Sequence, residues 1–335
     1  MIKIAVDAMG GDFAPESTVL GAMRAVEQFK DIELTLYGDE SKIRKYLTTE
    51  ERIKIVHTDS FIDMGEHDPV RQIRNNRKSS LVLAMKSCKE GENDGIVTAG
   101  PTQAVIVGAH IIIKRIPQMS RVALCPIIPS VSGKHKMVLD VGANVELRPE
   151  HLEELAIYAT AAAKVVFGVE SPRVGLLNIG TEPGKGREVD QLTHDLLKAN
   201  PNINFVGNVE TKEILTADCE VLLTDGFTGN MVIKTLEGTA KGSGEILKNC
   251  IKESFWGKIG YIFMRKSLKK YKQILACDDV GGAMLCGVNV PVVKSHGLSD
   301  PNAFYHAIRR VRELIDSKLV ENVVAMLPEK EAKNE

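Results

Sequence analysis

The segment IKIAVDAMGGD (residues 2–12) contains the pattern that decides the fold. A short apolar run ends in a polar, glycine-rich loop, and a stretch with helical periodicity follows. The same unit recurs along the chain, and helical patterns such as residues 148–168, with Pro149 in the first turn and Gly168 at the end, separate the apolar runs. Apolar strands without alternation, separated by helices, predict an α/β fold with a mostly parallel sheet covered by helices on both faces. The predicted strands are residues 2–6, 33–37, 54–57, 95–98, 123–128, 137–139, 174–179, 203–206, 220–224 and 290–294.

Length and a change of character along the chain set the expected domain organisation. The 335 residues suffice for one large α/β domain, which we expect to span residues 1–328, and a change near residues 140–150 predicts two lobes with a cleft between them. An amphipathic helical segment at about 250–273 is expected to protrude from this domain. The charged residues 329–335 are expected to form a frayed tail.

Composition excludes several classes of protein. A formal net charge of −1 argues against a polybasic nucleic-acid binder. The chain contains no uninterrupted apolar run of about 18–20 residues, the length that spans a bilayer. Its first residues lack the features of a signal peptide, so we expect a cytoplasmic protein. The six cysteines show neither a C-x-x-C pair nor zinc-like spacing, and we expect reduced core thiols and no catalytic cysteine.

Small, polar, glycine-rich loops follow many of the predicted strands. In parallel α/β folds, ligands bind beyond the carboxyl ends of strands, where loop N–H groups and helix N-termini converge. Any one of these loops could be a structural turn, but together they predict a site for anionic groups, because glycine lets the backbone approach a ligand closely. The loops are residues 7–12, 98–103, 140–145, 178–188, 207–210, 225–230 and 295–300.

Within these loops a few side chains suit phosphate or acid–base chemistry. GTEPGKG (residues 180–186) does not have the spacing of a nucleotide P-loop, but Lys185 in such a loop suits a phosphate or an oxyanion. His296 follows a strand and precedes a glycine, so it could bind phosphate or act as acid or base. Asp7, Asp140 and Asp225 each close an apolar run. We expect them to fix loops or orient a cation, because no further ligands accompany them at metal-binding spacing.

Two basic segments suggest partners. In RQIRNNRKSS (residues 71–80), Arg71, Arg74 and Lys78 are predicted to share one helical face, with Arg77 beside it; this is either a solvated face or a docking site for an acidic protein. Residues 254–272 combine an apolar stripe with clustered cations and contain no acid. This combination is typical of an interfacial helix on an anionic membrane, and a helix in a dimer interface with a basic rim is the alternative. The residues expected to contact the membrane are Phe255, Trp256, Ile259, Ile262, Phe263, Lys266, Lys269 and Lys270.

Taken as a set, the motifs resemble the PlsX family of bacterial phosphate acyltransferases. The resemblance runs from residue 2 to about 312 and rests on IAVDAMGGD, RVGLLNIGTE, INFVGNVE, TDGFTGNMVIKTLEG and GGAMLCGVNVPVVKSHGLSD, in this order. It implies transfer of a long-chain fatty acyl group from acyl carrier protein to inorganic phosphate, which gives acyl phosphate for phosphatidic acid and phospholipid synthesis. It also implies a Rossmann-like fold similar to phosphate acetyltransferases and isocitrate or isopropylmalate dehydrogenases, a homodimer, no cofactor, and peripheral association with the membrane, where a glycerol-3-phosphate acyltransferase is a further candidate partner.

The chemistry implied by this resemblance requires phosphate positioning and an oxyanion hole rather than a protein nucleophile. We expect Lys185, Asn208, Asp225, Asn230 and His296 to do the catalytic work, with Asp225 holding its loop or orienting Lys185 or His296. Acidic carrier protein would dock on Arg71, Arg74, Arg77 and Lys78. The residues expected to bind phosphate or the acyl group are Asp7, Gly10, Gly11, Thr98, Gly100, Thr102, Gly142, Asn144, Gly180, Glu182, Gly226, Gly229 and Ser299.

The chain departs from the family pattern in two loops. Family members usually read SAGNTGA where this chain reads TAGPTQA (residues 98–104), so Pro101 replaces an Asn and Gln103 replaces a Gly. Arg187 stands where Asn is common. Three other functions remain open: a short-chain phosphate acyltransferase that uses acyl-coenzyme A, a dehydrogenase of the related fold, and a catalytically weakened membrane scaffold.

Overall fold

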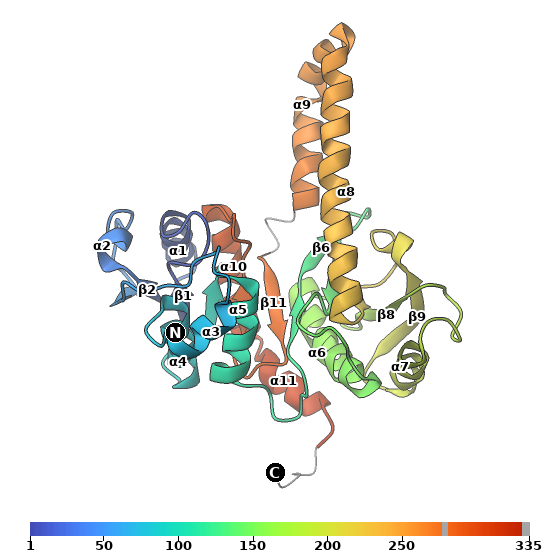
Figure 1. Ribbon diagram of the computed structural model, residues 1–335, viewed down its shortest axis with the longest axis horizontal. Coiled ribbons are helices and arrows are strands. Elements are labelled where there is room, and N and C mark those ends of the chain that lie inside the picture. The colour runs from blue at the N-terminus through green and yellow to red at the C-terminus, as the bar shows by residue number, and fades with distance from the viewer. Residues whose placement is uncertain (277–280, 330–335) are drawn as a thin grey trace.

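A seven-stranded sheet forms the first half of the molecule (Figure 1). In this computed structural model the described residues are 1–276 and 281–329. The four strands at one side run parallel, and β12 joins them in parallel to β4, whereas β11 is antiparallel to both β12 and β5. The strand order is β3 (Ile53–His57), β2 (Ile32–Gly38), β1 (Ile2–Asp7), β4 (Gly95–Thr98), β12 (Val292–Lys294), β11 (Ala283–Cys286) and β5 (Ala123–Cys125).

Helices cover both faces of this sheet, as the sequence predicts. Ile4 and Val6 pack into one core with α1 (Glu16–Gln28) and α10 (Pro301–Asp316), whereas Ala5 packs into a second core with α4 (Ser80–Lys89). Side chains alternate between the faces of a strand, so a strand that is buried on both sides reads as a continuous apolar run. The shorter elements on this half are α2 (Glu40–Ile43), α3 (Pro69–Asn75), α5 (Thr102–Gly108) and the π-helix η1 (Ala109–Ile113).

A five-stranded sheet forms the second half. Its strands are parallel except β6, which is antiparallel to β7. Met137 and Leu139 face the core that contains α6 (Pro149–Phe167), which ends at Gly168 with φ +64° as expected; Val138 faces the opposite side, with Ile233. The order is β6 (Ile127–Pro129), β7 (His135–Leu139), β10 (Val221–Leu223), β8 (Arg173–Asn178) and β9 (Asn204–Glu210). The remaining helices of this half are α7 (Glu188–Ala199), the 3₁₀-helix η2 (Thr211–Glu213) and α11 (Leu319–Met326), which packs near α6.

One strand prediction is wrong, and one strand was missed. The apolar run 123–128 is not one strand, because the chain breaks at Pro126 and passes from the first sheet, where β5 lies, to the second, where β6 lies. Proline has no N–H to donate to a strand ladder, which explains the break. The strand β11 was missed because its four residues, AMLC, are too few to show a strand pattern in the sequence. Its antiparallel pairing with β5 and β12 defines it.

A helical hairpin projects from the body (Figure 1). It consists of α8 (Gly226–Glu253) and α9 (Phe255–Ala276), and α8 is buried only at its base, at Gly226, Gly229 and Ile233. At about 1.5 Å per residue, the 28 residues of α8 extend about 42 Å, from the second sheet to the tip. Among the described residues no helix is long and apolar enough to span a membrane. Most of the tail expected at 329–335 lies outside the described residues.

Candidate functional site

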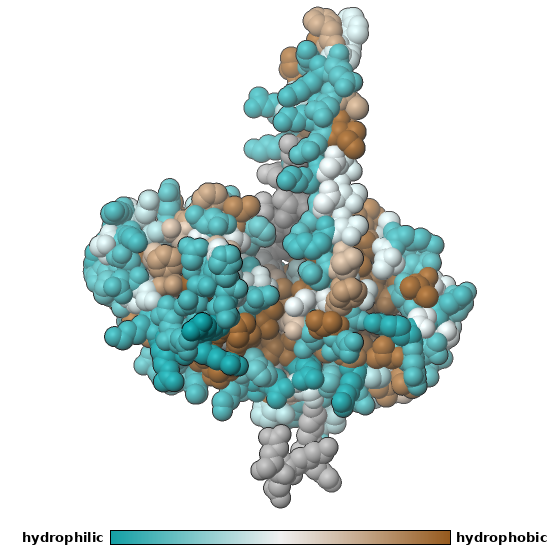
Figure 2. Space-filling model, in the orientation of Figure 1, coloured by the Kyte–Doolittle hydropathy of each residue, from teal (hydrophilic) through white to brown (hydrophobic). Residues whose placement is uncertain are grey.

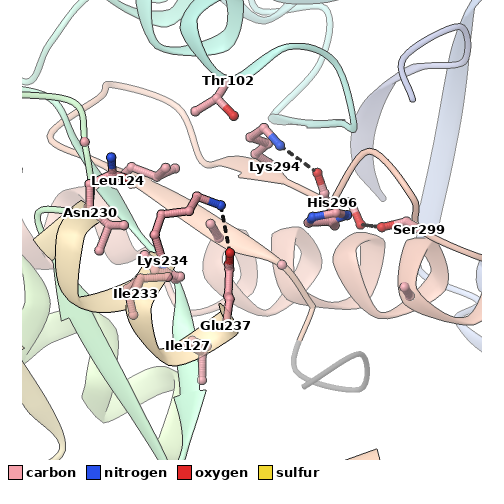
Figure 3. Close-up of a pocket in the computed structure, with 17 residues that line it drawn as sticks. Thr102, Leu124, Ile127, Asn230, Ile233, Lys234, Glu237, Lys294, His296 and Ser299 are labelled. Atoms are coloured by element: carbon pink, nitrogen blue, oxygen red, sulfur yellow. Dashed lines mark hydrogen bonds and ion pairs between the residues drawn. The ribbon is translucent and has the colours of Figure 1, made fainter. Parts of the chain in front are cut away.

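A pocket of about 390 Å³ lies between the two sheets. The first sheet contributes the loops that follow β4 and β12, and the second contributes the loop after β7 and the base of α8 (Figure 3). One part of the lining is apolar, and the other contains amide, hydroxyl, imidazole and ammonium groups. Four of the seven predicted ligand loops reach this pocket. The lining residues among those predicted are Thr102, Gly142, Asn230, His296 and Ser299.

On the first sheet, the loops that follow β1, β4 and β12 lock together. Asp12 N–H donates to Gly297 O at 2.8 Å, and Ser295 N–H donates to Thr98 O at 2.8 Å. The approach is close enough that a Cβ on Gly10 would lie 2.6 Å from Asp7 Oδ2. These three strands are parallel neighbours, so their carboxyl ends meet at one edge of the sheet.

Asp7 is the buried anchor of that edge. Its carboxylate accepts hydrogen bonds from Ser80 Oγ at 2.6 Å and from Thr98 Oγ1 at 2.7 Å, while Thr98 Oγ1 also accepts from Gly100 N at 2.9 Å. Burial raises the pKa of Asp7 above its ordinary value, and these hydrogen bonds oppose that rise. Asp7 and Thr98 therefore hold the loops and do not line the pocket.

Asp140 anchors the equivalent edge of the second sheet. It accepts backbone hydrogen bonds from Leu124 N at 3.0 Å, Ala143 N at 3.1 Å and Asn144 N at 2.7 Å, as expected of a carboxylate that fixes a loop. Burial raises its pKa. The base of α8 packs directly on this loop, since Gly226 N donates to Asn144 O at 2.8 Å and an added Cβ on Gly229 would lie 1.9 Å from Asp140 O. This packing places Gly142 and Asn230 at the pocket.

Asp225 pairs with Arg187, not with the residues that the sequence suggested. Arg187 Nη2 lies 2.5 Å from Asp225 Oδ2 and 2.9 Å from Asp190 Oδ1, and these carboxylates raise the pKa of the guanidinium. Asp225 Oδ1 also caps α8 by accepting from Thr228 N at 2.7 Å. No hydrogen bond or ion pair joins Asp225 to Lys185 or His296 among the described residues, so of the two expected roles Asp225 has the first, that of holding its loop.

The loop between β8 and α7 lies outside the pocket lining. Lys185 is exposed, and its ammonium group has no hydrogen-bond or ion-pair partner in the described part of the chain. Asn208 is buried and its Nδ2 donates to Glu182 O at 2.8 Å, so it holds this loop in place. A Cβ on Gly180 would lie 2.9 Å from Lys185 Cγ. The structure thus groups Gly180, Glu182, Lys185 and Asn208 with one another, apart from Asn230 and His296.

Two lysines of the pocket were missed by the sequence analysis. Lys294 is the last residue of β12, and Lys234 lies on α8 one turn after Asn230. Lys234 Nζ pairs with Glu237 at 2.8 Å. Neither lysine lies in a glycine-rich loop, the sequence context that predicts a phosphate-binding lysine in this chain. Lys294 stands only two residues before His296, a signal that could have identified it.

Burial makes three of the described cysteine thiols less acidic. Burial raises the pKa of Cys88 to about 12 and that of Cys219 to about 11. Cys88, Cys125, Cys219 and Cys286 are buried as expected, but Cys250 is exposed on α8, so the expectation of a core thiol is wrong there. Cys277 lies outside the described residues. Within the described ranges, no three His, Cys, Asp or Glu side chains are placed to hold a metal ion.

The predicted basic face is only partly helical. Arg71 and Arg74 lie exposed on α3, but that helix ends at Asn75, so Lys78 does not share their helical face as predicted; Arg77 and Lys78 lie exposed in the link to α4. The Asp68 carboxylate caps the start of this helix by accepting a hydrogen bond from Arg71 N at 2.9 Å.

Comparisons with known proteins identify the family of this chain and agree with its fold. A family model described as "Fatty acid synthesis protein" matches residues 2–322. A curated phosphate acyltransferase of Acholeplasma laidlawii is 47% identical over 98% of both chains, and one of a Geobacillus species is 44% identical over 96% of this chain and 97% of its own.

Solved structures show the same fold at much lower identity. A phosphotransacetylase from Streptococcus pyogenes superposes with a TM-score of 0.60 at 17% identity, covering 96% of this chain and 94% of its own. A branched-chain phosphotransacylase from Enterococcus faecalis superposes with a TM-score of 0.56 at 14% identity, covering 93% and 99%. The likeness to phosphate acetyltransferases in fold is therefore confirmed. With the full-length match to curated relatives, these findings show that the chain belongs to the phosphate acyltransferase family of fatty acid and phospholipid synthesis.

Proposed function

We propose that this enzyme transfers a long-chain fatty acyl group from the thioester of acyl carrier protein to inorganic phosphate. The observation that carries the proposal is the two-sided pocket between the sheets. Leu124, Ile127 and Ile233 form an apolar part suited to the acyl chain next to a thioester, and Asn230 and His296 belong to a polar part suited to phosphate. Acyl phosphate, the product, is then available for phosphatidic acid synthesis.

The reaction needs positioned charges and no protein nucleophile. A phosphate oxygen attacks the thioester carbonyl carbon, the new C–O bond forms, and a tetrahedral oxyanion develops. The C–S bond then breaks and the electron pair leaves with the thiolate, whose pKa, about 8.5 by analogy with cysteine, lets it depart without strong acid help. Asn230 and His296 supply donors for phosphate or the oxyanion in this proposal. Lys185 is the proposed additional cation; it is exposed on the β8–α7 loop, outside the pocket lining.

The exposed arginines and lysine of residues 71–78 are the proposed docking site for acyl carrier protein. Arg71, Arg74, Arg77 and Lys78 are all exposed, and none has a carboxylate partner among the described residues. Such unpaired cations attract an acidic protein and accelerate its association. We also propose that the enzyme is a homodimer.

The tip of the hairpin is the proposed membrane contact. Phe255, Trp256, Ile262 and Phe263 are 70%, 76%, 71% and 82% exposed. Figure 2 shows hydrophobic residues near the tip, next to a hydrophilic surface on the same hairpin. Ile259 is half-buried, whereas Lys266, Lys269 and Lys270 are exposed and available to an anionic headgroup. Apolar burial and basic residues together, at about 1 kcal/mol per cation near an anionic leaflet, favour peripheral binding.

Thiol release from palmitoyl-acyl carrier protein, with and without inorganic phosphate, tests the reaction. We expect release that depends on phosphate and a product that hydroxylamine traps as the hydroxamate. Acetyl-coenzyme A as the alternative donor should react much more slowly. Faster reaction of acetyl-coenzyme A would favour the short-chain function. No release from a folded protein at saturating phosphate would contradict the proposal and favour a membrane scaffold.

Flotation with anionic vesicles tests the membrane contact. The double variant Trp256→Glu, Phe263→Glu should lose binding. The matched control Val131→Glu, Leu192→Glu changes two exposed apolar residues of the body, which are 72% and 51% exposed, and should bind as the wild type does. Equal flotation of the tip variant and the wild type would show that the hairpin tip is not the contact.

A further inference from the structure

Lys294 enters the pocket from the end of β12. Its backbone neighbours in the sheet are Thr98 of β4 and Ala283 of β11, so the side chain starts from a rigid position. Figure 3 shows Lys294 and Lys234 entering the same pocket from two different elements, a strand of the first sheet and the helix α8. A side chain held by a central strand is better placed for a ligand than one held by a loop.

The ammonium group of Lys294 has unused hydrogen-bond donors. It carries three N–H donors, and the described residues offer it one acceptor, Ser295 O at 3.1 Å. No carboxylate pairs with it in that part of the chain. The nearest pocket carboxylate on α8, Glu237, is already paired with Lys234. Two donors of Lys294 are thus left for the pocket.

The free-energy cost of burying the Lys294 ammonium group without a carboxylate partner indicates what kind of ligand fills the pocket. The side chain is partly buried, and removal of water together with the positive charge of Lys234 lowers the pKa of Lys294 to about 8. A cation without a partner in such a place is unfavourable unless an anion arrives to pair with it. Perturbed groups of this kind cluster at functional sites.

We propose that Lys294 binds the inorganic phosphate substrate directly, as the cation that holds it in the pocket beside His296 and Asn230. This inference rests on the proposed function and adds a phosphate-binding residue to it. The phosphodiester of a carrier-protein prosthetic group has related chemistry, but a deep strand position between both sheets suits the small nucleophile, which must lie next to the reacting carbonyl.

Three variants test this assignment. Lys294→Met removes the charge and keeps the length, Lys294→Arg keeps a charge, and Lys136→Met is the matched control. Lys136 is also a buried strand lysine whose pKa burial lowers, but it donates to Ala217 O and lies outside the pocket. Isothermal titration with inorganic phosphate gives the affinity directly, and steady-state kinetics give KM for phosphate and for palmitoyl-acyl carrier protein. Thermal melting checks each fold, and Lys294→Gln replaces Lys294→Met if the latter does not fold.

Loss of a charge-assisted hydrogen bond predicts phosphate binding weaker by about 10- to 100-fold in Lys294→Met. We expect KM for phosphate to rise with it, KM for the acyl donor to stay unchanged, Lys294→Arg to recover part of the affinity, and Lys136→Met to match the wild type. Unchanged phosphate affinity in Lys294→Met, or a rise confined to KM for the acyl donor, would overturn the assignment. Lys294-dependent phosphate binding without phosphate-dependent thiol release would support the site while contradicting the proposed function. A wild type that binds no phosphate would overturn the assignment.

Discussion

Replacement of Gly229 by alanine should misplace the base of α8. A Cβ at this position would lie 1.9 Å from Asp140 O and 3.0 Å from Thr224 Cγ2, and Cβ contacts below 3.0 Å essentially do not occur. The first turn of α8 must therefore move at least 1.1 Å away from the Asp140 loop, which is the difference between 1.9 and 3.0 Å. The obstacle is a backbone carbonyl of a residue whose N–H donates to Thr224 O and whose side chain holds three backbone N–H groups, so it cannot rotate aside as a flexible side chain would.

The magnitude follows from two opposing effects. Overpacking against rigid backbone costs about 3 kcal/mol at the upper end of its usual range, and the better helix propensity of alanine returns about 1 kcal/mol. The free energy of unfolding should fall by about 2 kcal/mol, which lowers Tm by about 3 °C in a chain of 335 residues. Gly238→Ala is the matched control on the same helix, because a Cβ there meets nothing within 4 Å. It should raise the free energy of unfolding by about 1 kcal/mol.

Activity should respond more strongly than stability. The moved turn carries Asn230 and precedes Ile233 and Lys234, all of which line the pocket, and a displacement of about 1 Å commonly costs about 100-fold in rate. Differential scanning calorimetry and phosphate-dependent thiol release measure the two effects. If Gly229→Ala melts and reacts like Gly238→Ala, then α8 is not set by its packing on the Asp140 loop and this reasoning is refuted.

Two further predictions concern thiols and acid stability. In the native protein Ellman's reagent should react rapidly with exposed Cys250 but slowly with buried Cys88 and Cys219, because burial raises the pKa of these two thiols. Loss of the fast phase in Cys250→Ser would confirm this prediction. A fast phase that persists at the buried sites would contradict it. Asp31 accepts from Arg312 at 2.7 and 2.9 Å, which lowers the pKa of Asp31 below 3.8. The contribution of the Asp31–Arg312 pair to the free energy of unfolding is therefore present above pH 3.8 and is lost as the pH falls through the lowered pKa. The Tm difference between wild type and Asp31→Asn should shrink in acid. A difference that stays constant with pH would argue against the pair.

The parallel strands could be predicted because a strand that is buried on both faces has a recognisable local sequence pattern. Ile4 and Val6 face one core and Ala5 faces the other, which turns the strand into a continuous apolar run. The strand β11 has no such pattern. Its partner Cys125 is far away in the sequence, and no local pattern records an antiparallel pairing of that kind.

The same contrast between local patterns and long-range contacts applies to the residues of the site. Asp140 could be predicted as a loop anchor, because a carboxylate at a strand end followed by glycine has a local explanation. Gly226 and Gly229 were expected to bind phosphate or the acyl group, but they pack against the Asp140 loop. Lys294 could not be recognised in this way. Its significance depends on the pocket formed where α8 of the second half meets β12 of the first, and on Glu237 being engaged by Lys234. The first of these is a contact between segments that are far apart in the sequence, and no local sequence pattern records it.

The same distinction bears on the departures from the family pattern. Pro101 precedes the first turn of α5 with φ −57°, a conformation that proline adopts without strain, and Gln103 is an exposed residue of that helix. The residue of this loop that lines the pocket is Thr102, which lies between them and follows the family pattern. Arg187, in turn, is held by Asp190 and Asp225. The changes at Pro101, Gln103 and Arg187 thus fall beside the pocket rather than in its lining, and this placement argues for retained phosphate acyltransferase chemistry rather than for a scaffold that has lost it.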